Sequence, residues 1–135
     1  MALKNDYHRV AVRSLDACDG TLAANVQEKA AFLAYHAFES AGCALADHIG
    51  LPVGPRIAHA KKIKHFTDAA KVLGKEHAVA ALAITLSSLR NSFLYPIENK
   101  TTGTYELPES KISAAQAKEL RKRVGGIVKW VGDAL

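Results

Sequence analysis

The residue with the clearest chemical potential is Arg90, in the stretch LRNSFLYP (residues 89–96), which closes a long apolar run. Arg90 follows Val79 by eleven residues, or three helical turns, so it should lie on or beside the apolar stripe of its helix. A charge in that position needs a partner, because an unpaired buried charge is strongly unfavourable. A guanidinium matches phosphate with two parallel hydrogen bonds, so the position favours a phosphate site. The alternative is an internal ion pair with a carboxylate that fixes helix packing.

Two of the residues that follow Arg90, Asn91 and Tyr95, could take part in the same site. Asn91 and Tyr95 are four residues apart, so they share a face if the helix continues that far. A tyrosine ring can stack on a nucleobase. We therefore predict that Arg90, Asn91 and Tyr95 line one side of a cleft that binds a nucleotide or an RNA phosphate.

A second set of polar residues interrupts the apolar segment AAFLAYHAFESAGCALA (30–46). They are spaced three and four apart and so form one line: His36, Glu39 or Ser40, Cys43 and Asp47. We predict that Glu39 meets Arg90 and orients its guanidinium. His36 could carry a proton, because the unperturbed pKa of histidine is close to neutrality. The alternative for His36 is a histidine that is hydrogen-bonded in the core.

Other kinds of site have little support in the sequence. His36 and Glu39 form a His-x-x-Glu pair, the reverse of the Glu-x-x-His order in di-iron bundles, and His59 and His65, six apart, do not share a helical face well. The two cysteines lack zinc spacing, and we interpret them as buried free thiols. Neither a glycine-rich phosphate loop nor a serine nucleophile motif occurs. We expect no metal and no cofactor.

The composition describes an ordinary globular domain. The chain has 135 residues, 49% hydrophobic and 23% charged, with a net charge of +5. This mildly basic balance is compatible with a nucleotide or RNA partner and does not require one. The longest apolar run, 78–86, is far shorter than the ~20 residues of a membrane span, and the N-terminus lacks the apolar core of a signal peptide. These features predict a cytoplasmic protein with no membrane partner.

The hydrophobic pattern predicts an all-α, up-down bundle of four to five helices in a single domain, residues 1–135. Thr21 is expected to cap the second helix, and the spacing of Ser113 and Gln116 predicts a capping box at the start of the last. Residues 97–112 should form a long loop. The expected helices cover 4–17, 22–49, 56–73, 75–94 and 113 to the C-terminus.

In their order and spacing, several of these segments resemble the HEPN family (higher eukaryotes and prokaryotes nucleotide-binding domains). The similarity extends over most of the chain, with a HEPN-like core at about 22–133. AYHAFESAGCALADHIG resembles the first long core helix of the family, and IAHAKKIKHF resembles the helix that opens near a histidine, here His59. LRNSFLYP and SAAQAKELRKRVGGIVKWV resemble its Arg-Asn motif and its closing helix.

The resemblance implies a helical bundle that forms a homodimer, in which the arginine motifs of two subunits face a shared cleft. It implies nucleotide or RNA binding, in some members as one half of a toxin–antitoxin pair or as the partner of a nucleotidyltransferase. Many members are metal-independent RNases, in which a histidine follows the arginine by four to six residues. Here Tyr95 stands in that region, and tyrosine is a poor base at neutral pH.

This departure favours binding over catalysis. If the protein is nevertheless an endoribonuclease, His36 or His59 must replace the missing histidine beside Arg90. A third alternative is a structural dimerisation module without a ligand.

Overall fold

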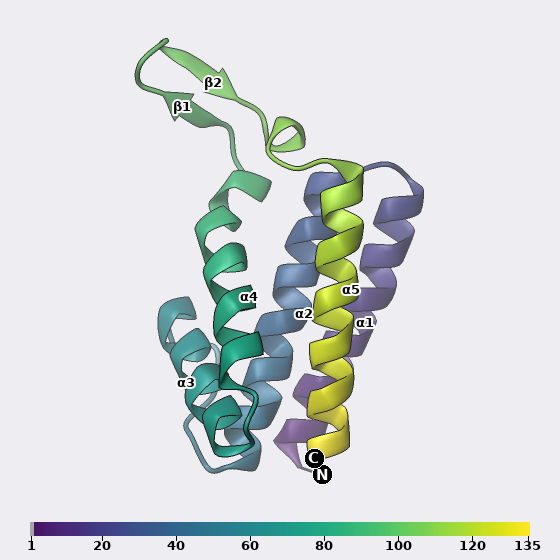
Figure 1. The fold of residues 1–135 in the computed structure, drawn as a ribbon, viewed down its shortest axis with the longest axis vertical. Helices are drawn as coiled ribbons and strands as arrows, with labels where there is room; N and C mark the ends of the chain where they lie inside the picture. Colours follow the sequence, from purple (N-terminus) through teal and green to yellow (C-terminus); the bar gives the residue numbers. More distant parts are fainter. Residues whose placement is uncertain (1) are drawn as a thin grey trace.

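The computed structural model describes residues 2–135 and contains five helices, which confirms the predicted all-α bundle (Figure 1). The helices are α1 (Leu3–Ala23), α2 (Gln27–His48), α3 (His59–Val72), α4 (Glu76–Leu89) and α5 (Ala114–Ala134). Two 3₁₀ turns and one hairpin of two strands connect α4 to α5. These short elements are η1 (Asn91–Phe93), β1 (Ile97–Asn99), β2 (Thr104–Glu106) and η2 (Pro108–Ser110).

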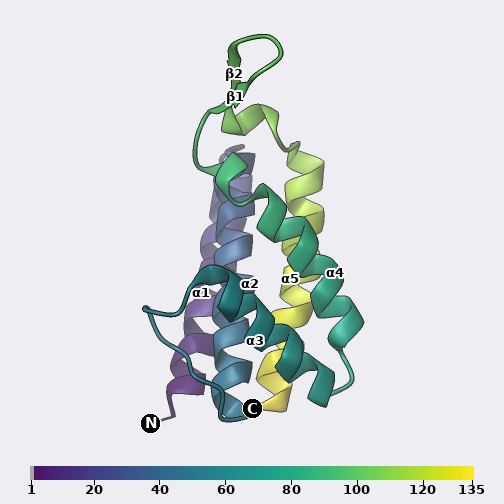
Figure 2. The same ribbon diagram turned by 90° about the vertical axis from the view of Figure 1, so that its left-hand side faces the viewer.

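Helix α2 is the centre of the molecule. It packs against α1 and α5 on one side and against α3 on the other, and α4 lies beside α3 (Figures 1 and 2). Every residue from 37 to 46 is buried, as expected for a helix that is apolar on nearly all sides. The helices around it therefore take their positions from α2.

The turn between α1 and α2 lies later in the sequence than predicted. The predicted cap, Thr21, lies inside α1, where its hydroxyl donates to the carbonyl of Ala17. The chain turns instead at Asn25, whose φ of 60° is the left-handed conformation that asparagine adopts more readily than most residues. The prediction of a second helix from residue 22 was wrong because a helix tolerates a hydroxyl side chain that bonds to the preceding turn.

The region after α4 is also more structured than predicted. The α-helix ends at Leu89 and continues as the 3₁₀ turn η1 rather than running to residue 94. The expected loop contains an antiparallel hairpin that pairs Ile97 with Glu106, and this hairpin projects beyond the end of the bundle (Figure 1). Gly103, with a φ of 72°, provides the left-handed residue of its turn.

A glycine brings α3 close to α2. A Cβ built at Gly42 would lie 2.6–2.9 Å from three carbons of Phe66, which is fully buried. Phe66 in turn packs against Phe38, with ring centroids 4.9 Å apart. The absence of a side chain at Gly42 thus sets the separation of the two helices that form the cleft described below.

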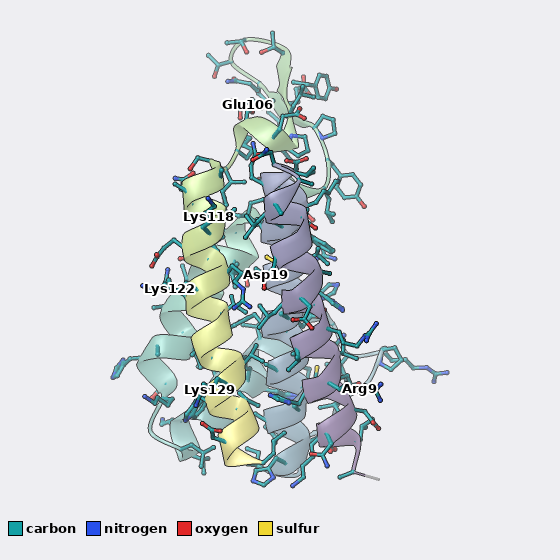
Figure 3. The ribbon with its side chains drawn as sticks, turned by 90° about the vertical axis from the view of Figure 1, so that its right-hand side faces the viewer. Arg9, Asp19, Glu106, Lys118, Lys122 and Lys129 are labelled. Carbon is teal, nitrogen blue, oxygen red and sulfur yellow. The ribbon has the colours of Figure 1, made fainter. Side chains whose placement is uncertain are left out.

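Helix α5 closes the bundle against α1 and α2. Its predicted capping box is confirmed, because the Ser113 hydroxyl accepts from the Gln116 amide at 3.1 Å and the Gln116 side chain accepts from the Ser113 amide at 2.9 Å. Arg121 holds Asp19 of α1 through two hydrogen bonds of 2.7 and 3.1 Å. The lysines Lys118 and Lys122 lie on the solvent side of α5 (Figure 3). None of the described helices is long and apolar enough to cross a membrane.

Candidate functional site

A cleft of about 350 Å³ opens where α2, α3 and the end of α4 meet. It lies on the side of the molecule where α3 and α4 stand in front of α2 (Figure 2). Its lining residues are Tyr35, His59, Ala60, Ile63, Ser87 and Arg90. Two of the residues singled out in the sequence, Arg90 and His59, therefore share one cavity.

Arg90 terminates α4 and reaches inward over two aromatic rings. Its guanidinium carbon lies 5.6 Å from the ring centroid of Tyr35 and 6.0 Å from that of Phe32, within the range of cation–π attraction. Its Nε is inaccessible to solvent and has no hydrogen-bond partner among residues 2–135. Nη1 donates to the Asn91 side chain at 3.3 Å. The predicted inward position of Arg90 is thus observed, and part of its hydrogen-bonding capacity is unused.

Glu39 does not pair with Arg90, so that prediction was wrong. The buried Glu39 carboxylate accepts from the Tyr35 hydroxyl at 2.7 Å and lies 2.6 Å from Nδ1 of His59. Lys62 approaches its other oxygen at 3.5 Å. The reason is the helical repeat of α2: Tyr35, one turn before Glu39, presents its ring to Arg90 and its hydroxyl to Glu39. The Arg90 guanidinium therefore lies over the ring of Tyr35, whereas the Glu39 carboxylate binds the hydroxyl group of the same residue.

This network shifts two pKa values. Burial acts to raise the pKa of Glu39, but hydrogen bonds from Tyr35 and His59, with the charges of His59 and Lys62, outweigh it and hold that pKa below its ordinary value. Burial raises the pKa of Tyr35 well above its ordinary value, and the hydrogen bond to Glu39 adds to this effect. Glu39 is therefore an ionised acceptor, and Tyr35 is a neutral donor, throughout the physiological pH range.

His59 presents one nitrogen to Glu39 and leaves the other available. Because an ionised carboxylate can only accept, the 2.6 Å contact requires a proton on Nδ1 of His59. In the neutral imidazole, Nε2 then carries the lone pair. The side chain is 52% exposed and lines the cleft. A carboxylate that fixes the tautomer and orientation of a histidine is a common arrangement in catalytic and metal sites.

The start of α3 adds to the positive character of this wall. Its N-cap residue, Ala58, has no side chain to accept from the free amides, and its first turn contains His59, Lys61 and Lys62 with no acidic residue. The positive end of a helix dipole favours negative charge. In α3 the side chains of the first turn are basic, so they add to the positive charge at the N-terminus of the helix and do not neutralise it.

Three other predicted residues lie outside the cleft lining. His36 is exposed on α2, and Asn91 is exposed at the edge, where it touches Arg90. Tyr95 is 61% exposed beyond η1. The prediction that Asn91 and Tyr95 share a helical face rested on a continuous α-helix, and α4 ends before both. No cluster of three or more histidine, cysteine or acidic residues that could hold a metal occurs in residues 2–135.

The sequence reasoning missed the aromatic and basic members of the site. Phe32, Tyr35 and Glu39 are spaced three and four apart, so they form a line on α2 that faces Arg90 and α3. Lys62 follows His59 by three residues, and both reach Glu39. The spacing of the aromatic residues was the available signal, but an aromatic residue at helical spacing usually belongs to a core.

Replacing Glu39 by Gln should remove a pH-dependent part of the stability. Because the folded-state pKa of Glu39 is depressed, its stabilisation is present above the ordinary pKa of 4.5 and is lost as the pH falls through the lower folded value. Wild type should exceed Glu39→Gln by about 2 kcal/mol in free energy of unfolding at pH 6, and the difference should shrink below pH 4.5. Urea denaturation between pH 3 and pH 7 measures it.

The matched control for that experiment is Glu98→Gln. Glu98 is exposed on β1, and its replacement should leave the pH profile of wild type unchanged. A difference between wild type and Glu39→Gln that stays constant across the pH range would contradict the ionised network.

Comparison with known proteins reveals a shared fold. No protein-family model matches the chain, and no curated protein does. Among solved structures, the crystal structure of TT1696 from Thermus thermophilus superposes over 100% of both chains, with a TM-score of 0.76 and 20% sequence identity. At that identity the similarity extends to the fold alone: this chain has the same helical arrangement as TT1696.

Proposed function

We propose that the cleft binds a phosphate group of a nucleotide or of RNA, with Arg90 as its principal contact. The observation that carries this proposal is the state of the guanidinium. Arg90 lines the cleft and is only partly buried, and it forms no salt bridge with an acidic residue among residues 2–135, because the nearby carboxylate of Glu39 is held by Tyr35, His59 and Lys62. An arginine without a carboxylate partner in a cavity is suited to an external anion.

The surroundings of Arg90 support the same ligand. The guanidinium lies over the rings of Tyr35 and Phe32, which hold it at the cleft. His59 lines the same cavity, and Lys62, on the same helix, contacts Glu39 behind it. The α3 first turn contains no acid that would repel an anion. The proposed ligand therefore meets a preorganised cation on one side and a basic helix terminus on the other.

Titration of the protein with adenosine monophosphate and with inorganic phosphate tests this proposal. Both should raise the melting temperature and shift the backbone amide signals of His59, Ala60 and Ser87 in NMR spectra. Sodium chloride at the same ionic strength is the control for screening. If neither compound changes these signals at millimolar concentration, or if the changes lie elsewhere on the bundle, the proposed site is wrong.

The pair of Glu39 and His59 favours a second candidate, metal-independent cleavage of RNA. With Nδ1 bonded to Glu39, Nε2 of His59 can take the proton of a ribose 2′-hydroxyl. The 2′-oxygen then attacks phosphorus, and the 5′-oxygen leaves with the bonding electrons and takes a proton from water. Arg90 would stabilise the charge on phosphorus. Of the two histidines considered in the sequence, the geometry favours His59, because His36 does not line the cleft.

RNA incubated with the protein in a chelator separates this candidate from simple binding. Cleavage should give 2′,3′-cyclic phosphate ends and should disappear in His59→Asn, while His36→Asn retains it. Binding of RNA without such products leaves binding as the function of the cleft.

A further inference from the structure

We infer that the cleft is built for a terminal phosphate, a dianion, rather than for the phosphodiester of an internal nucleotide, and that binding places a proton on Nε2 of His59. This inference rests on the proposed phosphate site. It adds the class of ligand and a link between binding and proton uptake.

The charged side chains at the cavity and directly behind its wall have a small net charge. Arg90 lines the cavity, Glu39 contacts the lining residue His59, and Lys62 contacts Glu39. Arg90 and Lys62 contribute two positive charges, and Glu39 contributes one negative charge. With His59 neutral the sum is one positive charge, which matches a phosphodiester. With His59 protonated the sum is two, which matches a terminal phosphate, whose charge is about −1.5 to −2 at pH 7. The cleft can thus adjust its charge by one unit at a single residue.

Charged groups of both signs surround His59. The titratable groups that contact His59 are Glu39 at 2.6 Å and Tyr35, whose ring it meets edge-on with centroids 6.4 Å apart. Lys62, on the same helix, shares Glu39 with it, and Arg90 lines the same cavity. Glu39 favours the imidazolium, whereas Lys62 and Arg90 oppose it. A dianion in the cavity would offset both opposing charges.

Nε2 is the nitrogen of His59 that is free to take the added proton. Nδ1 already carries the hydrogen bonded to Glu39, so the proton taken up lies on Nε2. There it forms a charge-assisted hydrogen bond to a phosphate oxygen while Arg90 binds from the other side. By linkage, a ligand that binds the imidazolium more tightly than the imidazole favours protonation of that histidine. Binding of the dianion at pH 7.5 therefore draws a proton from solution.

Calorimetric titration compares adenosine monophosphate with its methyl phosphodiester, which carries one charge. At pH 7.5 the second ionisation of the monoester, near pH 6, is nearly complete, so the ligand itself contributes few protons. Measurement in two buffers of different ionisation enthalpy gives the protons exchanged. We expect uptake of more than about half a proton and binding about tenfold tighter for the monoester, and no uptake for the methyl ester. Inorganic phosphate shows whether the phosphate alone is sufficient.

Two variants assign the proton. His59→Asn should abolish the uptake and make the two ligands bind with similar affinity. His36→Asn, which removes an exposed histidine of α2, should retain the wild-type values. Uptake that persists in His59→Asn would place the proton on another group and overturn the inference.

The outcomes also separate this inference from the function on which it rests. Equal binding of the two ligands without proton uptake, but dependent on Arg90, leaves a phosphate site and rejects the dianion. Failure of both ligands to bind rejects the phosphate site as well. Preference for the methyl ester likewise rejects a cleft built for two charges.

Discussion

Arg90→Ala should weaken the binding of adenosine monophosphate about 30- to 100-fold and leave the fold intact. The loss follows from removing a charge-assisted, two-point contact, which contributes about 2–3 kcal/mol. The fold should survive because Glu39 keeps its own partners, Tyr35, His59 and Lys62, when the arginine is absent. Calorimetry and thermal melting on the same samples measure the two effects.

The stability of this variant decides between a ligand site and a structural module. If Arg90 were half of a buried ion pair, its removal would destabilise the protein by about 3–5 kcal/mol. The observed contacts with Phe32 and Tyr35 predict a loss of only about 1 kcal/mol. Arg90→Lys keeps the charge without the planar fork and should bind at an intermediate affinity.

Arg13→Ala is the matched control for the change in net charge. Arg13 is exposed on α1, so its replacement should affect neither the affinity nor the melting temperature. A similar loss of affinity in both arginine variants would indicate nonspecific attraction to a basic protein, and the cleft would then not be the binding site.

Gly42→Ala should lower the melting temperature by roughly 4–12 °C. The added methyl group would overlap the ring of Phe66, and overpacking of a rigid core costs about 1–3 kcal/mol. The ring cannot easily move, because it is fully buried and packs against Phe38. Helix α3 must therefore shift away from α2. Calorimetry of unfolding measures the loss.

This variant also tests whether helix separation positions the site. A shift of α3 would lengthen the contact between His59 and Glu39, so phosphate binding should weaken in Gly42→Ala even where the protein is folded. The control is Gly126→Ala on α5, where a Cβ meets no atom within 4 Å. It should raise stability by about 0.5–1 kcal/mol, because alanine favours a helix over glycine. Equal effects of the two substitutions would contradict the close approach of α2 and α3.

The sequence was sufficient for the helices and for one half of the site. Hydrophobic periodicity predicted five helices and the inward position of Arg90, and the spacing of Ser113 and Gln116 predicted the cap of the last helix, because each depends on residues close together in the chain. The sequence did not predict the partner of Glu39, which contacts His59 rather than Arg90. Whether a carboxylate on α2 meets Arg90 or His59 depends on how far α3 and α4 slide along α2, and the close approach at Gly42 sets part of that geometry.

The HEPN resemblance remains a proposal about this chain, as do the homodimer and the nucleotidyltransferase partner that it implies. The resemblance implies roles for Arg90, which the helical pattern had already singled out, and for His59, and the structure brings both into one cavity. It gave no role to Tyr35, which contacts both the guanidinium and the carboxylate. Phosphate binding is proposed from these contacts, and its tests do not depend on the family.

The closing position of α5 has a consequence for how the chain folds. The cleft is assembled from residues 32–90, but α1 gains its second main helical neighbour, and α2 its third, only when α5 arrives, through contacts such as Arg121 with Asp19, 102 residues apart. Such distant contacts slow the folding of a helical protein relative to one built from neighbouring helices. During synthesis, the residues that form the cleft emerge before α5 does, so the apolar flanks of α1 and α2 stay uncovered until the last helix is made.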